Sequence, residues 1–256
     1  MAWRLVETAD GGAAWNMALD EAVAAAVRRG AAPPTVRFYG WTSPSVSIGC
    51  FQRARDVDLA FCERESIAVV RRPTGGRAVF HGRELTYSVS APRGALMPSS
   101  LLGTYRALSA AFLAAFKLLG LEPSAHTGRR PSAERSPLCF ASPSYGEVTL
   151  RGKKVVGSAQ RRWPDGFLQQ GSLPREVDRA RTARVFRLSG EEAPPAGLCE
   201  VVPDVTPEAL KDALRLGFEE VLGQALLPAP PTEEELKRAR ALEREKYLSP
   251  GWTLRR

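Results

Sequence analysis

The chain lacks the residue patterns that mark metal-binding, redox-active and secreted proteins. Its 256 residues include four cysteines, at positions 50, 62, 139 and 199, and two histidines. These cysteine spacings fit no Cys-x-x-Cys motif, so we expect free thiols, no metal and no cofactor. The N-terminus has no basic stretch followed by apolar residues, and no apolar run reaches the roughly 20 residues of a membrane span. We therefore expect a cytoplasmic protein without a membrane interaction.

Negative charge is also in short supply. The 36 basic and 28 acidic residues give a net charge of +8, and only six of the bases are lysines. The arginines are scattered along the chain, and no basic run of the kind that binds nucleic acid is present, so we expect no nucleic-acid partner. An acidic protein partner suits this charge, because opposite net charges raise the rate of encounter.

Helical and alternating patterns are mixed along the chain. Several local signals are clear: an apolar helical face over 15–29 with a stop at Gly30, a helix beginning after Ser99 or Ser100 and ending at Gly120, a Thr206-Pro207 helix start, and a capping box of Thr232 and Glu235. Strands are expected near 36–38, 46–49, 67–72 and 85–89, and a short helix over 58–66. This mixture predicts an α/β (α+β) fold with a mixed, largely antiparallel sheet and packed helices.

The chain divides into one large unit and a short tail. Residues 1–225 are expected to form a catalytic domain, and residues 226–256 a Pro-rich connection and a C-terminal helix packed on the same domain. Within the large unit, residues 121–146 are the longest irregular stretch and are expected to be a functional loop. A hairpin follows, with arms 147–151 and 154–160, and then a turn at 163–166.

The segment 71–81, Arg-Arg-Pro-Thr-Gly-Gly-Arg-Ala-Val-Phe-His, is the most informative stretch of the chain. An apolar strand runs into Gly75 and Gly76, where backbone amides can approach a ligand closely, and cations flank the pair. A tight turn between two strands explains the glycines equally well. His81 is a candidate general base or a structural hydrogen-bonding residue.

Two further segments contain reactive side chains. Lys153 and Lys154 are adjacent in a chain that otherwise prefers arginine, and a lysine can act as a tunable point charge in a site. Cys139 lies in the long loop, where a thiol is better placed to react than on a core strand. Cys50 and Cys62 are expected to be packing residues. Both histidines, 81 and 126, precede Cys139, which argues against a papain-like peptidase.

Together these segments resemble the superfamily of lipoate and biotin protein ligases, and within it the octanoyltransferases that use a cysteine nucleophile. The motifs that carry the resemblance are Trp-Asn-Met-Ala-Leu-Asp-Glu at 15–21, the segment ending at His81, Glu-Leu-Thr-Tyr-Ser at 84–88, Cys-Phe at 139–140, and Lys-x-x-Gly-Ser-Ala-Gln at 154–160. One departure is Gly82, where family members commonly have Asp.

The resemblance implies the catalytic-domain fold of these ligases and a role for particular residues. Cys139 would accept the acyl chain as a thioester, and Lys154 would lower the pKa of its thiol. The substrate-binding residues implied are Arg72, Thr74, Gly75, Gly76, Arg77, Ala78, Val79, His81, Gly157, Ser158, Ala159 and Gln160. Of these, the glycines, Val79 and Gly157 are expected to line an acyl pocket.

The implied reaction moves an octanoyl group from octanoyl acyl carrier protein to a lysine of a lipoyl domain or of a glycine-cleavage H-type protein. We expect the enzyme to be a monomer. An ATP-dependent lipoate ligase is one alternative, but such ligases typically have a third glycine where this chain has Arg77. The other alternative is an amidotransferase that moves octanoyl or lipoyl groups between carrier proteins with the same cysteine chemistry.

Overall fold

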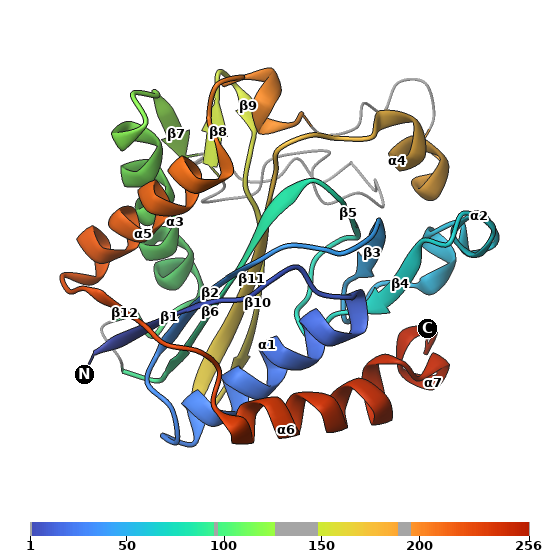
Figure 1. Cartoon of the computed structure of the whole chain (residues 1–256), viewed down its shortest axis with the longest axis horizontal. Coiled ribbons are helices and arrows are strands. Elements are labelled where there is room, and N and C mark those ends of the chain that lie inside the picture. The colour runs from blue at the N-terminus through green and yellow to red at the C-terminus, as the bar shows by residue number, and fades with distance from the viewer. Residues whose placement is uncertain (1, 95–96, 126–147, 189–195, 256) are drawn as a thin grey trace.

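A computed structural model describes residues 2–94, 97–125, 148–188 and 196–255. A six-stranded mixed sheet with helices on both faces forms the centre of the molecule (Figure 1). Its strand order is β10-β11-β6-β2-β1-β12. The strands are β1 (Trp3–Glu7), β2 (Thr35–Tyr39), β6 (Glu84–Pro92), β10 (Gly157–Trp163), β11 (Gly166–Pro174) and β12 (Leu226–Pro228). The β10, β11, β6 and β2 neighbours pair antiparallel, whereas β1 pairs parallel with β2 and β12.

Helices cover the two faces of this sheet. On one face, α3 (Leu101–Leu118) packs against α5 (Pro207–Leu222), and their apolar sides join the main core. On the other face, α1 (Ala13–Arg28) packs against α6 (Glu233–Leu242), as Figure 1 shows. The chain ends in a π turn (Glu243–Tyr247) and a short helix α7 (Pro250–Thr253). The α/β fold with a mixed, largely antiparallel sheet is therefore confirmed.

Helix α3 is long and apolar enough to resemble a membrane span by length and composition. About 33% of it is buried in the fold. The buried residues include Leu108, Phe112 and Phe116, which belong to the main core beside α5. One apolar face turned to a core is typical of a helix in a globular domain.

Two three-stranded sheets flank the large one. The first has the order β4-β3-β5, and the second has the order β7-β8-β9. Their strands are β3 (Ser45–Ile48), β4 (Ala68–Arg71), β5 (Val79–His81), β7 (Pro123–Ala125), β8 (Val148–Leu150) and β9 (Lys153–Lys154). The helices α2 (Leu59–Arg64) and α4 (Arg179–Phe186) pack together beside the first small sheet, and short 3-10 turns occur at Ala54–Asp56 and Leu198–Glu200.

The local signals in the sequence match the observed helix ends. Ser100 and Thr206 accept hydrogen bonds from Gly103 N and Ala209 N, and Thr232 forms the capping box with Glu235. Gly30 follows α1 with a φ of +73°. The hairpin expected from 147 to 160 is divided, because β9 ends at Lys154 and the chain then enters the large sheet as β10. Leu226–Pro228, expected as part of a connection, instead forms β12 beside β1.

Candidate active site

A small cavity of about 30 Å³, partly open to solvent, lies where the large sheet meets the first small sheet. Its walls come from α1, the end of β2, β3, β5, β6, β10 and β11. The lining residues are Met17, Tyr39, Trp41, Ser47, Arg72, Val79, His81, Thr86, Gly157, Ser158, Ala159, Gln170, Gly171 and Ser172. Aromatic, aliphatic and glycine surfaces alternate with a few polar groups, an arrangement typical of a small-molecule site. We call this space the acyl cavity, after the acyl pocket that the resemblance in the sequence leads us to expect.

Gly171 is required by close packing at the cavity wall. A Cβ at this position would lie 2.2 Å from a ring carbon of Tyr87. The Tyr87 hydroxyl in turn forms a hydrogen bond with Ser158 Oγ, at 2.7 Å. The absence of a side chain at Gly171 therefore lets Tyr87 reach across to β10.

A buried carboxylate supports the side chains of one wall. Asp20, fully buried on α1, accepts hydrogen bonds from Tyr39, Arg37, Ser88 and Gln170 at 2.7–2.8 Å. Arg37 is also fully buried and forms an ion pair with Asp20 at 2.7 Å. Burial, with the nearby Asp20 charge, raises the pKa of Tyr39 well above its usual value, so its hydroxyl stays a donor.

A second chain of polar contacts crosses the cavity beside His81. Trp41 Nε1 donates to Thr86 Oγ1, which donates to Glu84, and a Glu84 oxygen contacts His81 Nδ1 at 2.9 Å. His81 Nε2 contacts Ser47 Oγ at 2.7 Å. Burial raises the pKa of Glu84, but the charge of His81 and the hydrogen bonds to the carboxylate outweigh burial and hold that pKa below its usual value.

The two ring nitrogens of His81 are therefore both engaged within the protein. The acceptor and donor roles at Ser47 depend on the imidazole tautomer. In this arrangement His81 fixes neighbouring side chains. The sequence left open whether His81 is a general base or a structural hydrogen-bonding residue, and the geometry favours the structural role.

The glycine segment is a tight turn held by Arg72. The Arg72 guanidinium donates to the carbonyls of Gly75, Arg77 and Ser47. Gly76 has a φ of +84°. Its carbonyl oxygen packs closely on Gly49, and a Cβ added at Gly49 would lie 1.9 Å from that oxygen. Both interpretations of the segment therefore have support. The glycines form a tight turn, and Arg72 and Val79 on either side of it line the acyl cavity.

Lys154 lies near the two ends of the segment that bears Cys139. Its side chain is buried, and its residue pairs with Thr149 across β8 and β9. Ala125 and Val148, the last and first described residues on either side of 126–147, are register partners. The two ends of the segment 126–147 therefore lie side by side, and Val148 is next in the chain to Thr149, the strand partner of Lys154. Cys139 itself lies outside the described residues.

The structure brings six predicted substrate-binding residues to the acyl cavity: Arg72, Val79, His81, Gly157, Ser158 and Ala159. Thr74 lies behind the wall, where its hydroxyl donates to Gln170. Gly75 and Gly76, which were expected to line an acyl pocket, lie in the turn that Arg72 holds and are not among the residues that line this cavity. Arg77 and Ala78 belong to the same turn, and Gln160 contacts Gln169 and Arg162.

Other lining residues were absent from the predicted set. Met17 and Thr86 belong to motifs that carried the resemblance but had no assigned role. Tyr39, Trp41 and Gln170 belong to no motif in the sequence, and the face on which the strand residues Tyr39 and Gln170 lie depends on the neighbouring strands. Among the described residues, no group of three metal-ligating side chains is present.

Comparison with known proteins shows the family to which this chain belongs. Residues 12–224 match the family described as the lipoyl protein ligase A/B catalytic domain. The chain is 40% identical to an octanoyltransferase LipM of Kyrpidia tusciae; the match covers 99% of this chain and 99% of that protein. It is 39% identical to the octanoyltransferase LipM of Symbiobacterium thermophilum, and this match covers 99% of this chain and 98% of that protein.

Solved structures of ligases have a similar fold. A lipoate-protein ligase A bound with ATP is 28% identical with a TM-score of 0.84, and each chain is 99% covered. A bipartite lipoate protein ligase from Thermoplasma acidophilum, solved with its E2 lipoyl domain, is 26% identical with a TM-score of 0.80, over 99% of this chain and 96% of that one.

Proposed function

Because this chain belongs to the lipoyl protein ligase A/B catalytic-domain family and matches octanoyltransferases along nearly its whole length, it is an octanoyltransferase of lipoate biosynthesis, and we propose that it works through an acyl thioester on Cys139. The donor proposed is octanoyl acyl carrier protein. The acceptor proposed is a lysine of a lipoyl domain or of a glycine-cleavage H-type protein. We also propose that the enzyme acts in the cytoplasm as a monomer.

The observation that supports this mechanism is the position of Lys154. It lies three residues before Gly157, which lines the acyl cavity, and beside the paired ends of the segment bearing Cys139. A positive charge near a thiol favours the thiolate, which is the nucleophilic form. The buried ammonium of Lys154 is therefore suited to activate Cys139.

The reaction then has two balanced steps. In the first, the Cys139 thiolate attacks the donor thioester; the new carbon–sulfur bond forms as the old one breaks, and the carrier leaves as a thiolate. In the second, the neutral amine of the acceptor lysine attacks the acyl-enzyme. A carbon–nitrogen bond forms, the Cys139 thiolate leaves, and the proton lost by nitrogen is released. Thioester exchange is nearly balanced and amide formation is favourable, so ATP is not needed.

The energy source of the reaction distinguishes the proposed transferase from an ATP-dependent ligase. The protein would be incubated with an unmodified lipoyl domain and either octanoyl acyl carrier protein alone or free octanoate or lipoate with ATP and magnesium. The proposal expects the acyl mass on the lipoyl domain in the first mixture alone. Transfer in the second mixture alone would make the protein a ligase and remove the role of Cys139. Transfer from an octanoylated lipoyl or H-type protein alone would make it an amidotransferase.

A further inference from the structure

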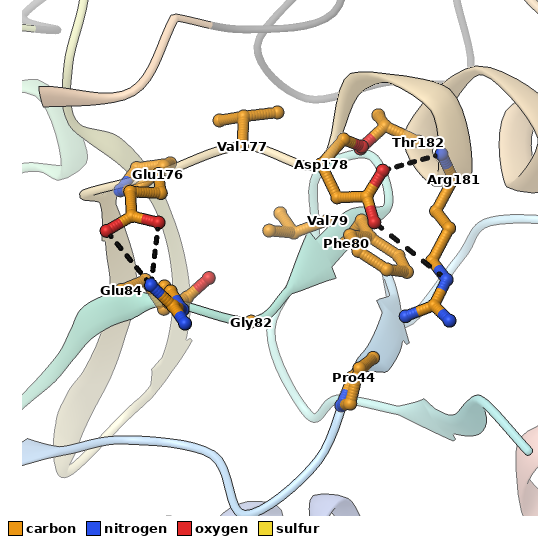
Figure 2. Close-up of a pocket in the computed structure, with 12 residues that line it drawn as sticks. Pro44, Val79, Phe80, Gly82, Glu84, Glu176, Val177, Asp178, Arg181 and Thr182 are labelled. Carbon is orange, nitrogen blue, oxygen red and sulfur yellow. Dashed lines mark hydrogen bonds and ion pairs between the residues drawn. The ribbon is translucent and has the colours of Figure 1, made fainter. Parts of the chain in front are cut away.

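A second and larger hollow adjoins the acyl cavity. This cleft, of about 320 Å³, lies between the β5–β6 turn and the segment that joins β11 to α4 (Figure 2). Its lining residues are Pro44, Val79, Phe80, Gly82, Arg83, Glu84, Pro174, Glu176, Val177, Asp178, Arg181 and Thr182. Val79 lines both hollows, so the cleft and the acyl cavity adjoin at this side chain.

The lining of the cleft suits an uncharged polar chain better than an ion. Arg83 on one wall pairs with Glu176 on the other at 3.0 Å, and Arg181 pairs with Asp178 at 3.8 Å, so these charges balance. Glu84 is turned toward His81. Between the ion pairs lie aliphatic and aromatic surfaces, and β5 is an edge strand of its sheet, whose outer side can offer backbone groups to a ligand.

Helix α4, beside the cleft, is rich in arginine, and Arg181 lines the cleft itself. Residues 179–187, which cover α4 and the residue after it, include four arginines and no acidic residue. Arg179, Arg181 and Arg187 are 49%, 44% and 58% exposed, although each has a carboxylate partner. Such exposed pairs contribute about 0–1 kcal/mol. An incoming phosphate or carboxylate can therefore replace these partners at little cost.

We propose that the cleft holds the flexible prosthetic arm of the acyl donor, and that the arginines of α4 bind the phosphate of that arm and the acidic surface of its carrier. This inference rests on the proposed function, since it assumes a carrier-bound thioester. The arm of an acyl carrier protein has amide groups along its length, a phosphate where it joins the protein and the thioester at its other end. The arginines of α4, the neutral cleft and the acyl cavity follow one another in the order of the phosphate, the amides and the thioester.

Gly82 provides a clean way to block the cleft. A Cβ at this position meets no atom within 4 Å, and the backbone there does not need glycine. The test compares Gly82→Leu with Gly82→Ala as the small matched control. Acyl loading would be measured with octanoyl acyl carrier protein, with octanoyl-pantetheine, and with octanoyl-N-acetylcysteamine, a thioester that lacks most of the arm.

If the arm lies in the cleft, Gly82→Leu raises KM about tenfold for the two long donors and leaves the short donor within about twofold, whereas Gly82→Ala changes none of them beyond twofold. Equal effects on all three donors, or none in a folded Gly82→Leu protein, would overturn the assignment of the cleft. Competitive inhibition by ATP that is lost in Gly82→Leu would assign the cleft to a nucleotide and overturn it also.

The proposed role of the α4 arginines has its own test. Arg181→Glu with Arg184→Glu should raise KM for octanoyl acyl carrier protein about tenfold at low salt, and less at about 0.5 M salt, while leaving octanoyl-N-acetylcysteamine unchanged. The matched control is Arg238→Glu with Arg240→Glu, which makes the same charge change on exposed positions of α6. Equal effects of the two pairs would show that only net charge matters and would overturn docking on α4.

The experiments distinguish a wrong proposed function from a wrong assignment of the cleft. If the wild-type protein is not loaded by octanoyl acyl carrier protein at all, the donor assignment is wrong and the docking proposal falls with it. If the wild-type protein is loaded but the variants do not discriminate among donors, the function stands and only the cleft and α4 assignments are wrong.

Discussion

The imidazole of His81 stacks on the indole of Trp41, with ring centroids 3.8 Å apart and an interplanar angle of 13°. Both rings line the acyl cavity, and Trp41 also donates to Thr86. Trp41 therefore fixes both the shape of the cavity and the orientation of the histidine.

Replacing Trp41 should separate these two roles. Trp41→Ala removes a buried aromatic ring and should lower the free energy of unfolding by about 3–5 kcal/mol, whereas Trp41→Phe loses mainly the hydrogen bond to Thr86, about 1 kcal/mol. In the enlarged cavity of Trp41→Ala, the rate with decanoyl donor should rise relative to octanoyl donor. Denaturant unfolding and donor competition measure the two effects. An unchanged chain-length preference would show that Trp41 does not bound the acyl chain.

Asp20 should be among the most sensitive buried positions. Its carboxylate pairs with Arg37, and both side chains are fully buried. Asp20→Ala leaves Arg37 as a buried charge without its counter-ion, which should cost about 3–5 kcal/mol of unfolding free energy. Exposed Asp165→Ala, which breaks the surface pair with Arg28, is the control and should cost at most about 1 kcal/mol. Similar losses in both variants would contradict the importance of burial.

Glu84 should make stability depend on pH in the acid range. Its folded pKa is below the unfolded value of about 4.3, so the carboxylate stabilises the fold above that value. This contribution is lost as the pH falls through the folded pKa. The difference in unfolding free energy between wild type and Glu84→Gln should therefore shrink between about pH 5 and pH 3. Parallel curves for the two proteins would contradict the lowered pKa.

Cys139 should be the residue that carries the acyl group. Intact mass after mixing with octanoyl acyl carrier protein should show one octanoyl adduct, absent in Cys139→Ala and retained in Cys199→Ala. Cys62 is a useful internal contrast, because burial and the nearby Asp58 charge raise the pKa of its thiol to about 11. An adduct that persists in Cys139→Ala would mean that another residue carries the chain.

Lys154 should lower the pKa of the Cys139 thiol. Lys154→Ala removes the positive charge, so the thiol pKa should rise and alkylation by iodoacetamide at neutral pH should slow; each unit of pKa represents about 1.4 kcal/mol. The adjacent Lys153, 52% exposed, gives a matched control, and Lys153→Ala should leave the pH profile of labelling unchanged. Identical profiles for wild type and Lys154→Ala would show that the two groups do not interact.

Features that depend on neighbouring residues in the chain could be predicted from the sequence. Helix caps such as Thr232 with Glu235 follow from hydrogen bonds only a few residues long. The strands β1 and β12 could not be predicted in the same way, because they pair across more than 200 residues of chain.

The same distinction applies to the site. Val79, His81 and Gly157 belong to recognisable motifs, whereas Tyr39 and Gln170 belong to none and are joined at the cavity wall by hydrogen bonds to Asp20. That contact joins α1, β2 and β11, and no local pattern encodes it.

The C-terminal segment is built into the strand that precedes the glycine turn. The fully buried Arg71 guanidinium donates to the carbonyls of Trp252 and Thr253, and the Trp252 indole donates back to Arg71 O. Near the other end of the chain, Arg4 pairs with Glu235 at 2.6 Å. These contacts join residues 181 and 231 positions apart in the sequence. Contacts of such long range carry a loop-closure cost and slow folding, so the support of the active site is completed only when residues 235–253 have packed against it.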